Sequence, residues 1–118
     1  MKLNPKLQDG AYVFASVDEA IVSSLTPVCI FRESEGTTII IPESVAAQNN
    51  IRYDFRAAWI VLTANTNLND IGITAKFAKI LFDNGISCNV FAPINHDHIF
   101  VPYDKGEHAV KLLESLEL

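Results

Sequence analysis

The two halves of the chain repeat one order of short elements, and this repetition limits the folds that the sequence can adopt. Runs rich in β-branched and aromatic residues predict strands, and apolar residues spaced three and four apart predict helices. Each half predicts a strand, a helix, a strand hairpin and a second helix. The expected strands cover residues 11–16, 28–32 and 37–41, then 57–64, 87–92 and 96–101. The expected helices cover residues 18–25 and 44–49, then residues up to 84 and a last segment through Val110, Leu112, Leu113 and Leu116.

The repetition reaches individual residues. The string TIIIP at 38–42 is matched by HIFVP at 98–102, and Cys29 is matched by Cys88. Two unrelated hairpins built from the same strand-forming residues would also give such matches, but the shared order of elements favours duplication. We therefore predict an α+β chain of the ferredoxin-like class, with antiparallel sheets and helices on one face of each. The expected βαββα units are residues 1–52 and 53–118, within one compact tandem domain.

The long helix of the second half has a clear apolar pattern. Its expected buried stripe comprises Ile71, Ala75, Ala78, Leu81 and Phe82, broadened by Ile73, Phe77 and Ile80. The polar loop before it, residues 65–70, has the composition of a helix cap. Before the last helix, the spacing of Asp104 and Glu107 predicts a capping box.

Composition excludes several classes of partner. The chain has 118 residues and a net charge of -5, with no cluster of Lys or Arg, so we expect neither nucleic-acid nor membrane-surface binding. Its apolar runs are far shorter than the ~20 residues of a membrane span. Because the first residues also lack the apolar core of a secretion signal, we expect a cytoplasmic protein.

The low charged fraction points to self-association. Only 19% of the residues are charged, below the usual quarter for a soluble domain. The run at 57–62 is apolar without alternation, so both faces of that strand should be covered, which one layer of helices cannot do. We therefore predict a homodimer or a larger homo-oligomer.

No catalytic arrangement is visible, so we expect a protein that is not an enzyme and has no cofactor. The sequence lacks a nucleophile elbow and a phosphate-binding loop of the Walker type. His96, Asp97 and His98 suggest a metal site, because imidazole and carboxylate groups bind zinc. Strand alternation, however, places the two histidines on one face and Asp97 on the other. A metal-dependent enzyme using these residues is thus a remote alternative.

The best candidate for a binding site is the loop at 65–72. The backbone N–H groups at the start of the following helix favour a carboxylate or phosphate, and Gly72 would let a ligand approach closely. The alternative is that the loop only caps the helix. Asn89 interrupts an apolar strand with an amide that could orient a ligand or bond to a neighbouring backbone group. Asp97, near a hairpin end, could face the same ligand or cap the turn.

Three strings carry a family resemblance: NLNDIGITA at 67–75, GISCNV at 85–90 and HDHIFVP at 96–102. With them, the chain resembles the ACT-domain family, and in particular small stand-alone proteins with two ACT-like units in tandem, similar to the regulatory domains of aspartate kinases. The resemblance spans nearly the whole chain. It implies two ACT-like units and a non-catalytic regulatory protein that binds a small molecule, usually an amino acid.

The function predicted from the sequence is therefore that of a non-catalytic sensor or regulatory protein that binds a small molecule, with an amino acid as the expected ligand. The alternative from another class is a protein–protein interaction module without a ligand. Seven residues are the candidate ligand contacts: Asn67, Leu68, Asp70, Ile71, Gly72, Asn89 and Asp97.

Overall fold

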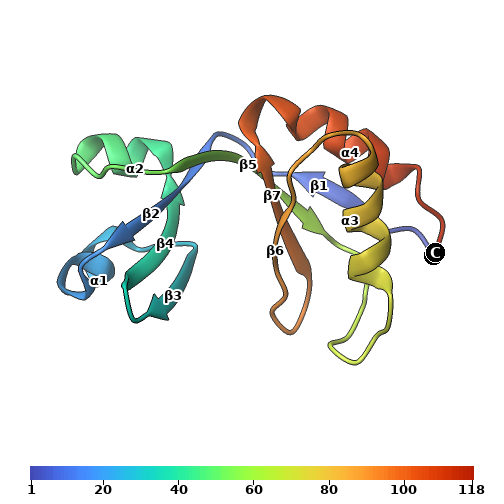
Figure 1. Ribbon diagram of the computed structural model, residues 1–118, viewed down its shortest axis with the longest axis horizontal. Helices are drawn as coiled ribbons and strands as arrows, with labels where there is room; N and C mark the ends of the chain where they lie inside the picture. Colours follow the sequence, from blue (N-terminus) through green and yellow to red (C-terminus); the bar gives the residue numbers. More distant parts are fainter. The chain divides into compact units, whose positions relative to one another are not determined.

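The structure is a computed structural model that describes residues 1–118, and the chain divides into two compact units (Figure 1). The N-terminal unit is Gly10–Ala57. The C-terminal unit combines Met1–Asp9 with Ala58–Leu118. The sequence placed residues 1–9 in the first unit, whereas in the structure this segment belongs with the second half of the chain. The reason is a short strand that pairs with the second unit, described below.

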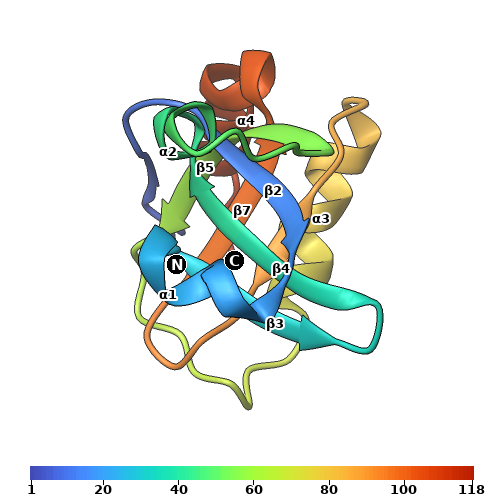
Figure 2. The same cartoon turned by 90° about the vertical axis from the view of Figure 1, so that its left-hand side faces the viewer.

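The N-terminal unit, whose strands β2, β3 and β4 are labelled in Figure 2, is an antiparallel sheet with short helices. Its strands lie in the order β3, β4, β2 and the beginning of β5. The strands are β2 (Tyr12–Val17), β3 (Cys29–Glu33), β4 (Gly36–Pro42) and β5 (Phe55–Leu62). The helices are the 3-10 turn η1 (Glu19–Ile21), α1 (Val22–Leu25) and α2 (Glu43–Gln48). Seven buried apolar residues form its core: Val13, Ala15, Val22, Leu25, Ile39, Ile41 and Ala46.

The start of the first helical segment follows its sequence signal. The Asp18 carboxylate accepts a hydrogen bond from the Ala20 N–H at 3.1 Å, as an N-cap residue does. The helix ends at Thr26, which has a left-handed φ of 44° and stands before Pro27. The sequence therefore specifies both ends of this segment locally.

The C-terminal unit is larger and carries the two longest helices. The rest of β5 lies between β1 (Pro5–Leu7) and β7 (Asp97–Pro102), and β6 (Asn89–Phe91) forms the edge beside β7. Its helices are α3 (Ile73–Asp83), the 3-10 turn η2 (Tyr103–Lys105) and α4 (Gly106–Glu114). Eleven residues form its core: Leu3, Ala58, Ile60, Leu62, Phe77, Leu81, Ile86, Ile99, Val101, Ala109 and Leu113. Burial of these side chains is the main stabilising term for the unit.

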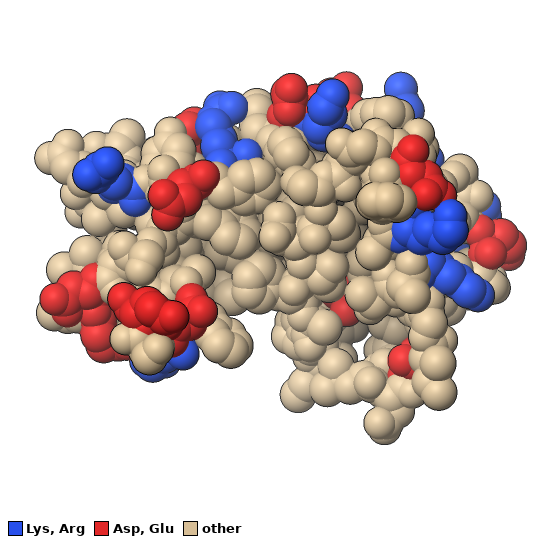
Figure 3. Space-filling view, in the orientation of Figure 1, with Lys and Arg blue, Asp and Glu red and all other residues tan.

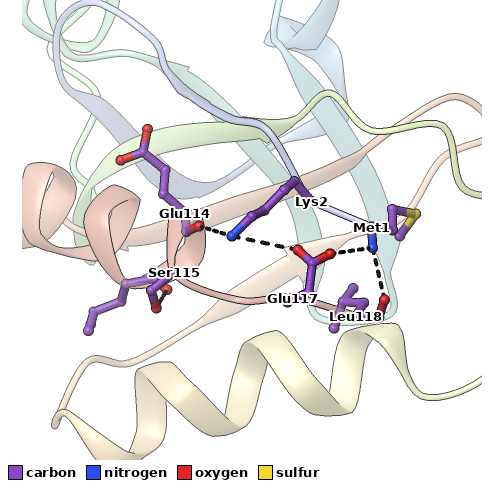
Figure 4. A network of polar contacts seen from close by, with 7 residues as sticks. Met1, Lys2, Glu114, Ser115, Glu117 and Leu118 are labelled. Carbon is purple, nitrogen blue, oxygen red and sulfur yellow. Dashed lines mark hydrogen bonds and ion pairs between the residues drawn. The ribbon is translucent and has the colours of Figure 1, made fainter.

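The two ends of the chain meet in this unit (Figure 4). The Met1 ammonium lies 3.2 Å from the Glu117 carboxylate and donates to the Leu118 carbonyl oxygen at 2.9 Å. Lys2 donates to the Glu114 carbonyl oxygen at 3.3 Å. Because these charges are exposed to water, the pairs add little stability, and the buried Leu3 side chain contributes more to holding the segment in place.

Three local predictions for the helices are wrong. Ile71 is 97% exposed because α3 begins only at Ile73, and Phe82 is 78% exposed. Each residue advances a helix by about 100°, so a stripe centred on Phe77 and Leu81 leaves Phe82 on the far side. The capping box is also absent: Asp104 lies within η2, and α4 follows Lys105, which makes no side-chain cap bond.

The fold class predicted from the sequence is confirmed. Each half is a mixed α+β unit of the ferredoxin-like type, with antiparallel strand pairs and a helical layer that covers the core. None of the helices combines the length and the apolar character that crossing a lipid bilayer requires.

Candidate functional site

A small pocket opens in the C-terminal unit, at the end where β5 leads into α3. It has a volume of about 80 Å³ and is lined by three segments: the β5–α3 loop, the first turn of α3 and the β6–β7 turn. The lining residues are Thr66, Asn67, Leu68, Asp70, Ile73, Thr74, Ala92, Pro93, Ile94 and Asp97. In Figure 1 the yellow-green loop and the orange turn extend past the same end of the unit.

The topology explains why loop and turn are neighbours. The chain leaves β5 at this end, α3 carries it back, and β6 returns it to the end at which it started. A turn that follows β6 must therefore lie beside a loop that follows β5. The predicted βαββ order already places the Ala92, Pro93 and Ile94 segment beside the loop, although the site predicted from the sequence omits this segment.

The loop is ordered by bonds among its own residues. Asp70 accepts a hydrogen bond from the Asn67 N–H at 2.9 Å, and the Asn67 side chain accepts one from the Asn69 N–H at 3.1 Å. The Asp70 N–H donates to the Asn67 carbonyl oxygen at 3.0 Å. These polar side chains shape the loop, which is the usual role of Asx turns. They do not cap the helix, contrary to the expectation from composition.

The start of α3 is left without a side-chain cap. Gly72 occupies the N-cap position with a φ of 87°, and no side chain bonds to the first-turn N–H groups. These unpaired donors, together with the positive end of the helix dipole, attract an anionic group. Because Ile73 and Thr74 line the pocket, this anion-binding end is directed to the same place as the loop.

Asp97 brings a carboxylate to the pocket from the opposite side. Its side chain is half-buried and lines the pocket. Burial raises the pKa of the Asp97 carboxyl above its ordinary value, and the nearby His98 partly offsets this rise. The lining contains two carboxylates, from Asp70 and Asp97, and no Lys, Arg or His. In Figure 3 the region of the β5–α3 loop and the β6–β7 turn shows red acidic and tan atoms but no blue basic ones.

The two histidines beside Asp97 point elsewhere. His98 Nδ1 accepts a hydrogen bond from Trp59 Nε1–H at 3.0 Å, and the Trp59 ring stacks on Phe100 with centroids 5.9 Å apart. Burial lowers the pKa of His98, and the nearby His96 lowers it further. His96 does not line the pocket, and no group of three or more His, Cys, Asp or Glu side chains could hold a metal ion.

Three of the candidate residues do not line the pocket. The Ile71 side chain points into solvent, and Asn89 donates to the Phe100 carbonyl oxygen at 3.5 Å. Gly72 has no atom within 4 Å of where a Cβ would stand, so a side chain there would not block the pocket directly. Its φ of 87° is nevertheless one that β-branched residues rarely adopt, and glycine is needed for this reason.

The N-terminal unit has an opening at the matching place in the repeat, between the β2–α1 connection and the β3–β4 turn. Its volume is about 470 Å³ and four carboxylates line it, those of Asp18, Glu19, Glu33 and Glu35. Here Glu19 already binds Arg32, with contacts of 2.8 and 3.1 Å, and accepts a bond from Thr37 at 3.1 Å. The two halves of the repeat therefore differ in chemistry at the same topological position.

Comparison with known protein families covers the whole repeat. A model of the ACT domain matches residues 1–58, and a second ACT-domain model matches residues 54–115. No curated protein matches the chain.

Solved structures share this architecture. A Vibrio cholerae protein of unknown function, described as a possible transport protein, is 36% identical with a TM-score of 0.92, over 100% of this chain and 92% of that one. An Agrobacterium tumefaciens protein is 23% identical with a TM-score of 0.77, covering 96% and 87%. The regulatory subunit of aspartate kinase from Thermus thermophilus is 8% identical with a TM-score of 0.61, covering 92% and 93%, so it supports the fold alone.

Proposed function

Because the chain belongs to the ACT-domain family, we propose that it is a non-catalytic regulatory protein whose pocket between the β5–α3 loop and the β6–β7 turn binds the head group of an amino acid. The observation that carries this proposal is the pairing of opposite chemistries in one small opening. The uncapped amides at the start of α3 suit a carboxylate, and the Asp97 carboxylate suits an ammonium group.

The size of the pocket supports a head group rather than a large ligand. Its volume of about 80 Å³ is well below the ~300–1,000 Å³ of sites that enclose drug-sized molecules. Leu68 and Ile94, which are 65% and 77% exposed, stand at its edge as apolar surface that the remainder of a ligand could cover. A nucleotide, with several phosphates, would face two carboxylates and no basic side chain.

Binding would regulate by selecting among arrangements of the loop. The loop is tied by bonds among its own residues, so a ligand that bridges α3 and Asp97 favours the arrangement in which both are in reach. The regulated protein would be the partner that binds the ligand-favoured arrangement of the loop. If no ligand exists, the chain is an interaction module.

Replacing Asp97 by asparagine tests the site. We expect Asp97→Asn to weaken amino-acid binding by about 10- to 100-fold, because it removes a charge-assisted hydrogen bond worth about 1.5–3 kcal/mol. The measurement is calorimetric titration of the amino acid that gives the largest thermal shift among the twenty.

The matched control is Asp104→Asn, which removes an exposed carboxylate in the same unit and should leave affinity unchanged. Equal affinity of the Asp97→Asn variant and the unmodified protein would exclude the proposed site. An absence of any shift across the twenty amino acids would favour the interaction module.

The raised pKa of Asp97 predicts that acid weakens binding. An ammonium group prefers the ionised carboxylate, and burial makes Asp97 take up its proton at a higher pH than an ordinary aspartate. Affinity should therefore fall as the pH drops through this raised pKa, by up to about tenfold per pH unit for one proton. The free energy of unfolding of the ligand-free protein should change in the opposite direction. Because the pKa of Asp97 is raised in the folded state, protonation of Asp97 favours that state, so stability should rise as the pH drops through this pKa. Titrations from neutral to acid pH should show the decline, and the Asp97→Asn variant should lack it.

A further inference from the structure

We propose that the contact between Trp59 and His98 is a pH-sensitive switch, which joins strands β5 and β7 while His98 is neutral and releases them at this point when His98 takes up a proton. The Trp59 Nε1–H donates a hydrogen bond to His98 Nδ1 at 3.0 Å, and the two ring centroids lie 5.7 Å apart. Strands β5 and β7 are neighbours in the sheet of the C-terminal unit (Figure 1). His98 is the second residue of β7, so the contact holds the start of that strand.

The chemistry of the two rings makes this hydrogen bond incompatible with a charge on His98. An indole nitrogen has a hydrogen to donate and cannot accept one. The Nδ1 atom of His98 must therefore be unprotonated, and the neutral ring carries its hydrogen on Nε2. A protonated imidazole carries hydrogens on both nitrogens and accepts on neither. Protonation of His98 thus breaks the hydrogen bond to Trp59.

Aromatic side chains surround the contact and disfavour a charge on His98. Trp59 stacks on Phe100, which is 1% exposed, and the Phe91 ring meets Phe100 edge-on. Phe91 also stands opposite His98 in the β6–β7 hairpin. A protonated imidazole that is half-buried here loses hydration that aromatic carbon does not replace.

Two groups beside His98 in the sequence act on its charge, and the neighbouring strands add none. His96 disfavours a proton on His98, and Asp97 favours one. From β5 and β6 the residues that contact or face His98 are Trp59 and Phe91, which carry no charge. Burial has the largest effect, and the pKa of His98 is lowered from its ordinary value. The switch should therefore operate below the pH of about 6.5 at which an unperturbed histidine titrates.

The lowered pKa also determines how His98 links stability to pH. The unfolded chain takes up this proton at a higher pH than the folded chain does, so acid favours unfolding. The contribution of neutral His98 is complete above the ordinary histidine pKa and is lost as the pH falls from there through the lowered one. Asp97 has the opposite effect, and it is kept in every variant below so that the comparison isolates His98.

The fluorescence of Trp59, the one tryptophan of the chain, tests the switch. Between about pH 8 and about pH 4 we expect the emission of the unmodified protein to fall in a one-proton step, because a charged imidazole quenches an adjacent indole. His98→Gln should lose this step, since its amide oxygen can accept from Trp59 but does not titrate. A titration of the unmodified protein without the step, or an unchanged step in His98→Gln, would overturn the proposal.

The matched control is His96→Gln, which removes the neighbouring imidazole and leaves the contact between Trp59 and His98 in place. His96 Nδ1 has no hydrogen-bond partner, so the substitution breaks no bond at that atom. We expect the step to remain and its midpoint to move to a higher pH, because His96 no longer opposes a charge on His98. Loss of the step in His96→Gln would assign the titration to His96 and contradict the proposal.

Nuclear magnetic resonance of the unmodified protein covers the case in which His98→Gln does not fold. The single indole N–H signal should move upfield in the same step in which the His98 ring titrates, because its hydrogen bond is lost. An indole signal that does not move in that step, or a neutral His98 with its hydrogen on Nδ1, would contradict the proposal. These measurements need no amino acid, so their outcome is independent of the proposed function of the pocket.

Discussion

Replacing Phe77 by alanine is expected to lower the free energy of unfolding of the C-terminal unit by about 3–5 kcal/mol. Phe77 is fully buried in the core cluster, one of the two largest buried side chains of the chain. Its removal loses the transfer free energy of the ring and leaves a cavity that α3 can close only in part. Since domains are stable by only about 5–15 kcal/mol, the variant should be close to unfolding at room temperature.

The control for this experiment lies on the same helix. Phe82→Ala removes an identical ring that is 78% exposed, and we expect a change below about 0.5 kcal/mol. The chain has one tryptophan, Trp59, which lies in the C-terminal unit, so its fluorescence during urea unfolding reports on that unit. Similar losses in the two variants would show that α3 does not pack as described.

The second large effect is expected at Gly106, the first residue of α4. A Cβ atom there would stand 2.8 Å from the Ala58 Cβ atom and 3.2 Å from Leu7 Cδ1. Because Ala58 belongs to β5, the clash is with an atom fixed to the sheet, and relief requires α4 to move away. We expect Gly106→Val to cost about 3 kcal/mol in the free energy of unfolding, at the upper end of ordinary overpacking.

Its control is the next residue of the helix. Glu107 is exposed, so Glu107→Val introduces the same side chain without a clash and should cost less than about 0.5 kcal/mol. The two variants can be compared by the same urea titration followed by Trp59 fluorescence. If Gly106→Val were as stable as Glu107→Val, the close approach of α4 to β5 and β1 would be wrong.

The sequence predicts the fold well because the repeated pattern is local. Alternation and turn residues within each half specify the strands and their hairpins, and the similar strings at 38–42 and 98–102 indicate the duplication. Strand β1 is different. It has three residues, among them Pro5 and Lys6, and its place is decided by pairing with β5 and by burial of Leu3 in a distant core. No local pattern carries that information.

The candidate site, like the fold, could be predicted from the sequence only in part. The loop residues Asn67, Leu68 and Asp70 are predicted because they precede a helix, and Asp97 because it stands near the end of a hairpin. All four line one pocket. Asn89 was selected for its amide alone, and that amide bonds within the β6–β7 hairpin. A side chain's partner depends on the register of two strands, which periodicity does not specify.

The attachment of Met1–Asp9 to the second unit has a consequence for synthesis. Residues Gly10–Ala57 form a compact unit, and we expect this unit to fold once Ala57 has left the ribosome. Strand β1 emerges earlier but must wait for β5 and for α4, about a hundred residues later, which at ~5–20 residues per second takes on the order of 5–20 s. During that time the apolar Leu3 side chain has no core to enter. The nascent chain thus carries a folded unit between β1 and the partners of β1, and α4 secures a strand made about a hundred residues before it.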